Sequence, residues 1–211
     1  MKKILLIGDS IRQGYDKYVR MAFEGEAEIY YSSMNSRFSI YVLREISYWK
    51  EQLKLDDTVD CVHWNAGLWD DLVWHDGKHL VPIELYADYI DRICLEIKRL
   101  FPRAKIIFAT STPVQEHLFK TTKRYNSDTE KYNAVAVEAV LRHGGEINDL
   151  YGLMSALPDS YHSDLTHYYT KEGTRVLTEQ VVACLENALA IKGKALDYDT
   201  LFAEKTDAEG H

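Results

Sequence analysis

The sequence predicts one α/β domain, in which a parallel sheet is covered by helices on both faces. Short apolar segments alternate with longer segments that carry apolar residues at helical spacing. The first and fourth short segments, Lys3–Ile7 and Lys105–Ala109, are apolar runs typical of strands buried on both faces. A chain of 211 residues with 46% hydrophobic residues can also build a full core without disulfide or metal support.

Five segments are predicted as strands of this sheet. They are Lys3–Ile7, Ala27–Tyr30, Cys61–Trp64, Lys105–Ala109 and, with a weaker pattern, Glu146–Asn148. Sites in such sheets form at the carboxyl ends of the strands. The residues that directly follow each strand are therefore the first place to look for chemistry.

Helices are predicted between the strands and after the last one. They cover Arg12–Phe23, Ser39–Leu53, Pro82–Phe101, Thr129–Arg142 and Lys171–Ile191. Pro82 suits the first turn of its helix, and Gly144 follows another helix as a stop signal. Asp76-Gly77 predicts a small hairpin between the third strand and the next helix. We expect residues 1–192 to form the domain and residues 193–211 a polar, loosely attached tail.

The composition excludes several kinds of partner. With 25 Lys and Arg against 33 Asp and Glu, the net charge of -8 argues against a nucleic-acid-binding surface. The longest apolar runs are far too short to span a bilayer, so no membrane partner is expected. The apolar run after Lys2-Lys3 is also too short for a signal peptide, which favours a cytoplasmic protein.

No sequence feature indicates a cofactor. The three cysteines, Cys61, Cys94 and Cys184, are far apart and fit reduced thiols better than a disulfide framework or a metal site. Neither a Walker-type loop nor a Gly-x-Gly-x-x-Gly motif is present, so nucleotide binding is not expected. The Gly-x-Ser-x-Gly elbow of α/β-hydrolases is missing as well.

Gly8-Asp9-Ser10 lies directly after the first predicted strand and before the first helix. A serine at this edge of the sheet lies near a helix N-terminus, whose N–H groups favour developing negative charge. Either Asp9 or Ser10 could instead simply cap the helix. The tripeptide alone favours the capping role.

Asp164 and His167 lie three residues apart in a predicted loop before the last helix. A serine hydroxyl becomes a good nucleophile when a base takes its proton, and that base needs a carboxylate to fix its tautomer. On its own, a loop histidine beside a capping aspartate is the commoner arrangement. The presence of Gly8-Asp9-Ser10 at the other end of the chain favours catalysis.

Together these motifs resemble the GDSL/SGNH hydrolases, over about residues 3–190. Gly8-Asp9-Ser10-Ile11 stands near the start, and Asp164-x-x-His167 followed by Gly173 stands near the end. The resemblance implies a flavodoxin-like three-layer α/β/α fold with a sheet of about five strands. It further implies a carboxylic ester hydrolase with Ser10 as nucleophile, His167 as base and Asp164 as its orienting partner, without metal or cofactor.

The middle motifs of that family are matched only in part. Gly67 and Asp70 fit the block Gly-x-Asn-Asp, but Trp69 stands where the oxyanion-hole asparagine is expected. Losing one such donor costs about 100- to 1000-fold in rate. Asn65 could supply the amide instead, or the hole could rely on backbone donors.

The block after the second strand, residues 34–39, resembles the asparagine-containing variants of the family but has no glycine. A backbone N–H needs no particular side chain, so that of Ser36 or Arg37 could serve. The predicted oxyanion donors are therefore Ser10, Arg37 and Asn65. Predicted substrate contacts come from three residues near the nucleophile, namely Asp9, Gly67 and Trp69.

The expected function is hydrolysis of small acyl esters, above all acetyl esters, including those on carbohydrates. Two alternatives stay open at this point. One is a ligand-binding protein on the same fold whose catalysis is impaired by Trp69. The other is a metal-dependent hydrolase that uses His162, Asp164 and His167. The sequence leaves the oligomeric state open.

Overall fold

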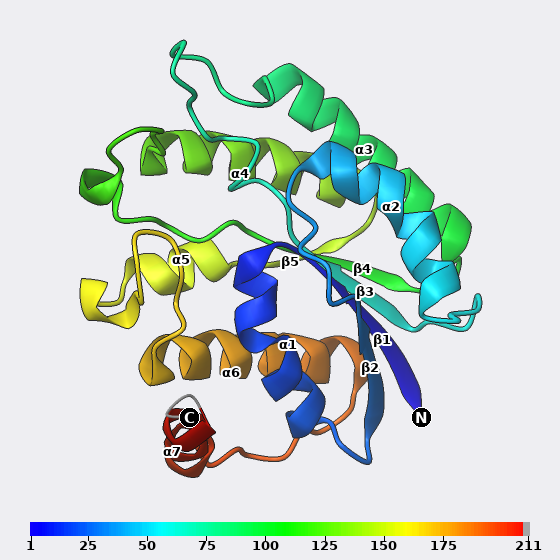
Figure 1. The fold of residues 1–211 in the computed structure, drawn as a ribbon. Coiled ribbons are helices and arrows are strands. Elements are labelled where there is room, and N and C mark those ends of the chain that lie inside the picture. The colour runs from blue at the N-terminus through cyan, green and yellow to red at the C-terminus, as the bar shows by residue number, and fades with distance from the viewer. Residues whose placement is uncertain (209–211) are drawn as a thin grey trace.

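Five parallel strands form a single sheet in the order β2-β1-β3-β4-β5, as the computed structural model shows (Figure 1). The structure describes residues 1–208, with side chains up to residue 203. The strands are β1 (Lys2–Ile7), β2 (Ala27–Tyr31), β3 (Cys61–Trp64), β4 (Lys105–Ala109) and β5 (Glu146–Asn148). In β1, Leu5 pairs with Tyr30 of β2 on one side and with Val62 of β3 on the other.

Helices cover both faces of this sheet (Figure 1). They are α1 (Ser10–Ala22), α2 (Ser39–Gln52), α3 (Ile83–Leu100), α4 (Asn126–Arg142), α5 (Leu150–Ser155), α6 (Lys171–Leu189) and α7 (Tyr198–Ala208). α2, α3 and α4 pack side by side on one face, while α1 and α6 pack together on the other. The predicted three-layer α/β/α architecture is therefore confirmed.

The alternation of side chains along the strands explains the two cores. In β1, Leu5 and Ile7 face the core under α2, α3 and α4. Ile4 and Leu6 face the core under α1, α5 and α6. Successive side chains of a strand point to opposite faces, so a continuously apolar run fits only a strand that is covered twice.

The predicted strands and helices are all present, with ends shifted by at most three residues. The hairpin at Asp76-Gly77 is present as well, since Val73 pairs with His79 and Trp74 N–H donates to the carbonyl of Lys78 at 2.8 Å. Helices α5 and α7 were not predicted. α5 has six residues, which is too short to show a helical pattern in the sequence.

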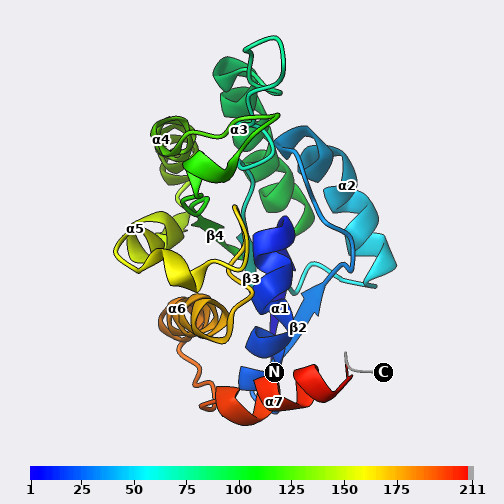
Figure 2. The same cartoon turned by 60° about the vertical axis from the view of Figure 1, so that its left-hand side comes forward.

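The described part of the segment after residue 192 contacts the domain. The Lys194 N–H donates to the carbonyl of Ala22 at 2.8 Å. Tyr198 and Phe202 lie one helical turn apart in α7, and both rings pack against Tyr18 of α1. α7 therefore lies beside α1 and α6 (Figure 2).

The three cysteines are free thiols, with Cys61 and Cys94 buried and Cys184 partly buried. Burial raises the pKa of Cys94 to about 12 and that of Cys184 to about 11. These thiols are protonated at neutral pH, which fits a structural role. Among residues 1–208, none of the helices has the length and apolar character that crossing a bilayer requires.

Candidate active site

The turn between β1 and α1 presents Ser10 as the first residue of α1. Asp9 is the N-cap, since its Oδ1 accepts hydrogen bonds from the Ile11 N–H at 2.9 Å and from Asn65 Nδ2 at 3.0 Å. Asp9 is only 1% exposed, and this burial raises the pKa of its carboxyl group although Asn65 and Ile11 donate to it. Asp9 therefore has the capping role, which leaves the hydroxyl of Ser10 free for chemistry.

Gly8 is required by close packing at this turn. A Cβ atom on Gly8 would lie 1.9 Å from Asn65 Oδ1 and 2.7 Å from Arg12 Cβ. Neither neighbour can retreat, because Asn65 and Arg12 are both buried. The glycine of Gly8-Asp9-Ser10 thus lets the strand end lie directly against Asn65.

Ser10, His167 and Asp164 form one chain of hydrogen bonds. Ser10 Oγ lies 2.7 Å from His167 Nε2, and His167 Nδ1 lies 2.8 Å from Asp164 Oδ2. With the proton on Nδ1 shared with the carboxylate, Nε2 is left to accept the proton of the serine hydroxyl. The three residues predicted as the catalytic set are therefore placed together, in the geometry of an activated nucleophile.

The Asp164 carboxylate is fixed by its own loop. Its Oδ1 accepts the N–H groups of Thr166 at 2.7 Å and His167 at 2.8 Å. Partial burial would raise the pKa of Asp164, but these two N–H groups and the imidazole together hold it below its usual value. Asp164 is thus ionised at neutral pH and able to orient His167.

The groups predicted as oxyanion donors have different hydrogen-bond partners within the protein. Arg37 has a left-handed backbone (φ 48°), and its N–H donates to Asn35 Oδ1 at 2.9 Å. The Ser36 N–H donates to the carbonyl of Gly8 at 3.1 Å. Both backbone groups offered by this loop are therefore already bonded. Asn65 uses one of its two amide hydrogens on Asp9, and Ser10 lies at the N-terminus of α1.

Gly67, Trp69 and Asp70 line the turn after β3. Gly67 has φ 149°, and a Cβ atom there would lie 2.4 Å from Ser111 Oγ. The Trp69 ring is half-buried and packs edge-on against Phe38, at 5.4 Å between centroids. Asp70 is fully buried and accepts the Ser39 N–H at 3.1 Å, so it caps α2. Of the predicted substrate contacts, Asp9 is instead buried as the N-cap of α1.

His162, a member of the alternative metal site, contacts Tyr168 and Pro113. Its ring lies 4.0 Å from that of Tyr168, and its Nε2 is 3.4 Å from the carbonyl of Pro113. Within the described residues, no three His, Cys, Asp or Glu side chains are placed to hold a metal ion.

Three residues near the site were missed by the sequence analysis, namely Arg12, Arg124 and Tyr169. Arg12 is buried in α1, pairs with Asp16 and donates to the carbonyl of Met34 at 2.7 Å. Its signal in the sequence is an Arg and an Asp four residues apart on the buried side of a helix. Arg124 contacts Leu68, Asp71 and Thr166, and the Tyr169 hydroxyl contacts Ser10, so these contacts lie far apart in the chain and local sequence does not show them.

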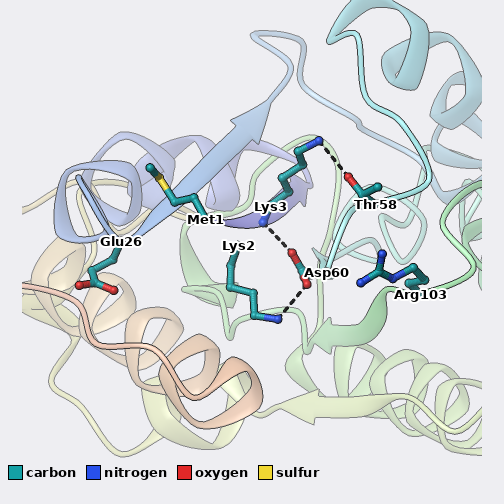
Figure 3. Close-up of a pocket in the computed structure, with 7 residues that line it drawn as sticks. All are labelled: Met1, Lys2, Lys3, Glu26, Thr58, Asp60 and Arg103. Carbon is teal, nitrogen blue, oxygen red and sulfur yellow. Dashed lines mark hydrogen bonds and ion pairs between the residues drawn. The ribbon is translucent and has the colours of Figure 1, made fainter.

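A separate hollow lies at the amino ends of the strands, opposite to Ser10 (Figure 3). Asp60 accepts hydrogen bonds there from Lys2 Nζ and the Lys3 N–H, both at 2.9 Å. Lys3 Nζ donates to Thr58 Oγ1 at 2.9 Å. These groups satisfy one another, and none of them pairs a nucleophile with a base.

The fold is that of the GDSL-like lipases and acylhydrolases. A lipase/acylhydrolase from Enterococcus faecalis superimposes with a TM-score of 0.71 and 19% identity, covering 93% of this chain and all of the other. An acetylxylan esterase from Geobacillus stearothermophilus gives a TM-score of 0.66 and 16% identity, covering 86% of this chain and 93% of the other. A GDSL-like lipase from Bacteroides thetaiotaomicron gives 0.66 and 17%, covering 89% of each chain. No protein-family model and no curated protein matches the sequence.

Two buried acids beside the site predict an unusual dependence of stability on pH. Burial raises the pKa of Asp70 to about 7 and that of Asp71 to about 6, against about 3.9 for an exposed aspartate. The folded state thus binds protons that the unfolded state has lost. This stabilisation is complete below about pH 4 and disappears as the pH rises through 7. Between pH 5 and pH 8 the free energy of unfolding of the wild type should therefore decrease. We expect this decrease to be about 2–3 kcal/mol smaller in Asp70→Asn.

Urea denaturation at several pH values measures this change. Asp57→Asn, at an exposed position, is the matched control and should keep the wild-type slope. A slope for Asp70→Asn equal to that of the wild type would show that Asp70 is ionised throughout this range.

Proposed function

We propose that this protein is a serine esterase of the GDSL/SGNH type that hydrolyses esters of small acyl groups. The observation that carries this proposal is the chain Ser10 Oγ–His167 Nε2–Asp164, with steps of 2.7 and 2.8 Å. Its position at the carboxyl end of β1 and at the N-terminus of α1 supports the same function.

In the first half of the reaction, Ser10 Oγ attacks the ester carbonyl carbon while His167 Nε2 takes the hydroxyl proton. Asp164 stabilises the imidazolium that forms. When the tetrahedral intermediate collapses, the C–O bond to the alcohol breaks and His167 returns the proton to the leaving alkoxide. The acyl group is then bound to Ser10, and a water molecule activated by His167 releases it as the carboxylic acid.

The negative charge on the carbonyl oxygen needs donors near the nucleophile. We assign the Ser10 N–H to this role, because it belongs to the first turn of α1 and no helix carbonyl precedes it. The second hydrogen of Asn65 Nδ2 is the further donor, since its first is used on Asp9. Under this assignment Asn65 replaces the asparagine that Trp69 displaces.

Acetyl esters, including acetylated carbohydrates, are the substrates that we expect. Two acetylxylan esterases are among the proteins that share this fold. The exposed or half-buried rings of Trp69 and Trp74 near the loops after β3 are suited to stack on a sugar. We expect no metal and no organic cofactor in the reaction.

The test combines an ester panel with active-site labelling. We expect hydrolysis of 4-nitrophenyl acetate and of acetylated xylo-oligosaccharides, falling with acyl chain length and unchanged by a chelator. A fluorophosphonate probe should add one phosphonyl group, at Ser10, as mass spectrometry of the peptides would show. Absence of turnover and labelling, with saturable binding of a sugar ester, would instead indicate a binding protein. Chelator-sensitive hydrolysis without labelling would indicate a metal-dependent enzyme.

A further inference from the structure

Tyr169 touches both halves of the candidate site, the serine on α1 and the histidine on the loop before α6. Its hydroxyl donates to the main-chain carbonyl of Ser10 at 2.7 Å. Its ring stacks on the imidazole of His167, with centroids 4.7 Å apart and planes 19° apart. Among the described residues, Tyr169 is the one side chain that both hydrogen-bonds to Ser10 and packs on the ring of His167.

Tyr169 is also fixed to the loop that carries the histidine. Its N–H donates to Ser163 Oγ at 3.1 Å, and Ser163 in turn donates to the carbonyl of His167 through its N–H at 2.7 Å and its Oγ at 3.1 Å. Ser163 therefore links the backbone of Tyr169 to that of His167 and holds the two together.

The ring has room because α1 carries a glycine opposite to it. A Cβ atom on Gly14 would lie 2.8 Å from Cε1 of the Tyr169 ring, which is too close for two carbon atoms. Gly14 lies in the interior of α1, where glycine is the poorest helix former apart from proline. The helix thus has an unfavourable residue at the position where the tyrosine ring packs.

We propose that Tyr169 is a positioning residue that holds the His167 imidazole against Ser10. This proposal rests on the function proposed above. The hydroxyl fixes the distance between α1 and the histidine loop, and the ring keeps Nε2 aimed at Oγ. The face of the ring also favours the cation that His167 becomes when it takes the serine proton. Loss of this role should lower kcat and leave KM nearly unchanged, because the ring acts on His167 and not on the bound ester.

The test measures kcat per active site, counted by complete labelling with a fluorophosphonate. Tyr169→Leu removes ring and hydroxyl, and we expect kcat to fall about 30- to 100-fold with little change in KM. Tyr169→Phe keeps the stacking ring and should lose only about fivefold, as expected for one hydrogen bond. A purely structural role would lower the melting temperature and the fraction of labelled sites while leaving kcat per labelled site unchanged.

Gly14→Ala gives an independent arm. Alanine favours the helix, so thermal stability should not fall, yet its methyl group displaces the ring and kcat should drop several-fold. In the Tyr169→Leu background the same change should have no further effect on kcat. Tyr48→Leu, at an exposed position of α2, is the control and should match the wild type.

Three results would overturn the proposal. They are an unchanged kcat per site in Tyr169→Leu, a loss that lies wholly in KM, and a Gly14→Ala effect that persists without the tyrosine. Failure of the function proposed above looks different, because the wild-type protein would then neither hydrolyse esters nor react with the probe.

Discussion

Replacing Ser10 by alanine is expected to reduce kcat/KM for an aryl acetate by about 10,000- to 1,000,000-fold. Alanine cannot form the acyl-enzyme, and the remaining activity comes from binding and from donors at the N-terminus of α1. His167→Ala should cost a similar factor, because Ser10 Oγ has His167 Nε2 as its only side-chain partner in the described residues. The double variant should be no worse than either single one, since nucleophile and base act as one unit.

Initial rates with highly purified protein measure these effects, and Ser160→Ala, at an exposed serine, is the matched control. All four proteins should have the same melting temperature within a few degrees. A Ser10→Ala activity within tenfold of the wild type would contradict the assignment of the nucleophile. Multiplicative losses in the double variant would show that Ser10 and His167 act separately.

Replacing Arg124 by methionine is expected to lower the free energy of unfolding by about 3–5 kcal/mol at pH 8. Arg124 is 9% exposed and pairs with Asp71 at 3.3 Å, while the Asp71 side chain is 1% exposed. Its guanidinium also bonds the carbonyl of Leu68 and lies 3.4 Å from Thr166 Oγ1. Without Arg124, Asp71 would be a buried carboxylate with Thr129 as its one neutral hydrogen-bond donor among the described residues.

The loss should be smaller at pH 5. Burial already raises the pKa of Asp71 to about 6 with the arginine present, and removal of a positive neighbour raises it further. At pH 5 the carboxyl group is therefore protonated and no buried charge is left unpaired. Adding Asp71→Asn to Arg124→Met should likewise recover part of the stability at pH 8.

Arg99→Met is the control for the loss of an ion pair as such. Arg99 bonds Glu96 at 2.8 Å with good geometry, but its side chain is 64% exposed. Exposed ion pairs contribute little to stability, so this change should be small at both pH values. Equal effects of Arg99→Met and Arg124→Met in urea denaturation would contradict the special role given to the buried pair.

The fold could be predicted from the sequence because its signals are local. The runs after Lys2 and Lys105 are apolar on both faces, and the long helices carry apolar stripes. α7 was missed because its docking depends on Tyr18, which lies 180 residues earlier than Tyr198 in the chain. A helix of 11 residues with few apolar side chains has no pattern that reveals its partner.

Part of the candidate site could be predicted from two features, namely the type of a residue and its position relative to a strand. Ser10 follows β1 directly, and Asp164 and His167 are near neighbours in one loop. The backbone of Arg37 could not be predicted, since its N–H is engaged through an asparagine turn that depends on the exact dihedral angles. The Tyr169 contact with Ser10 crosses 159 residues, so only the folded chain shows it.

The separation of Ser10 from His167 by 157 residues has a consequence for biosynthesis. At about 5–20 residues per second, the ribosome makes His167 about 8–30 s after Ser10. β1 also lies between β2 and β3 in the sheet, and β3 is made later than β2. Under the proposed function, a nascent chain therefore carries an inert serine until the loop with His167 has been made and α6 can dock beside α1.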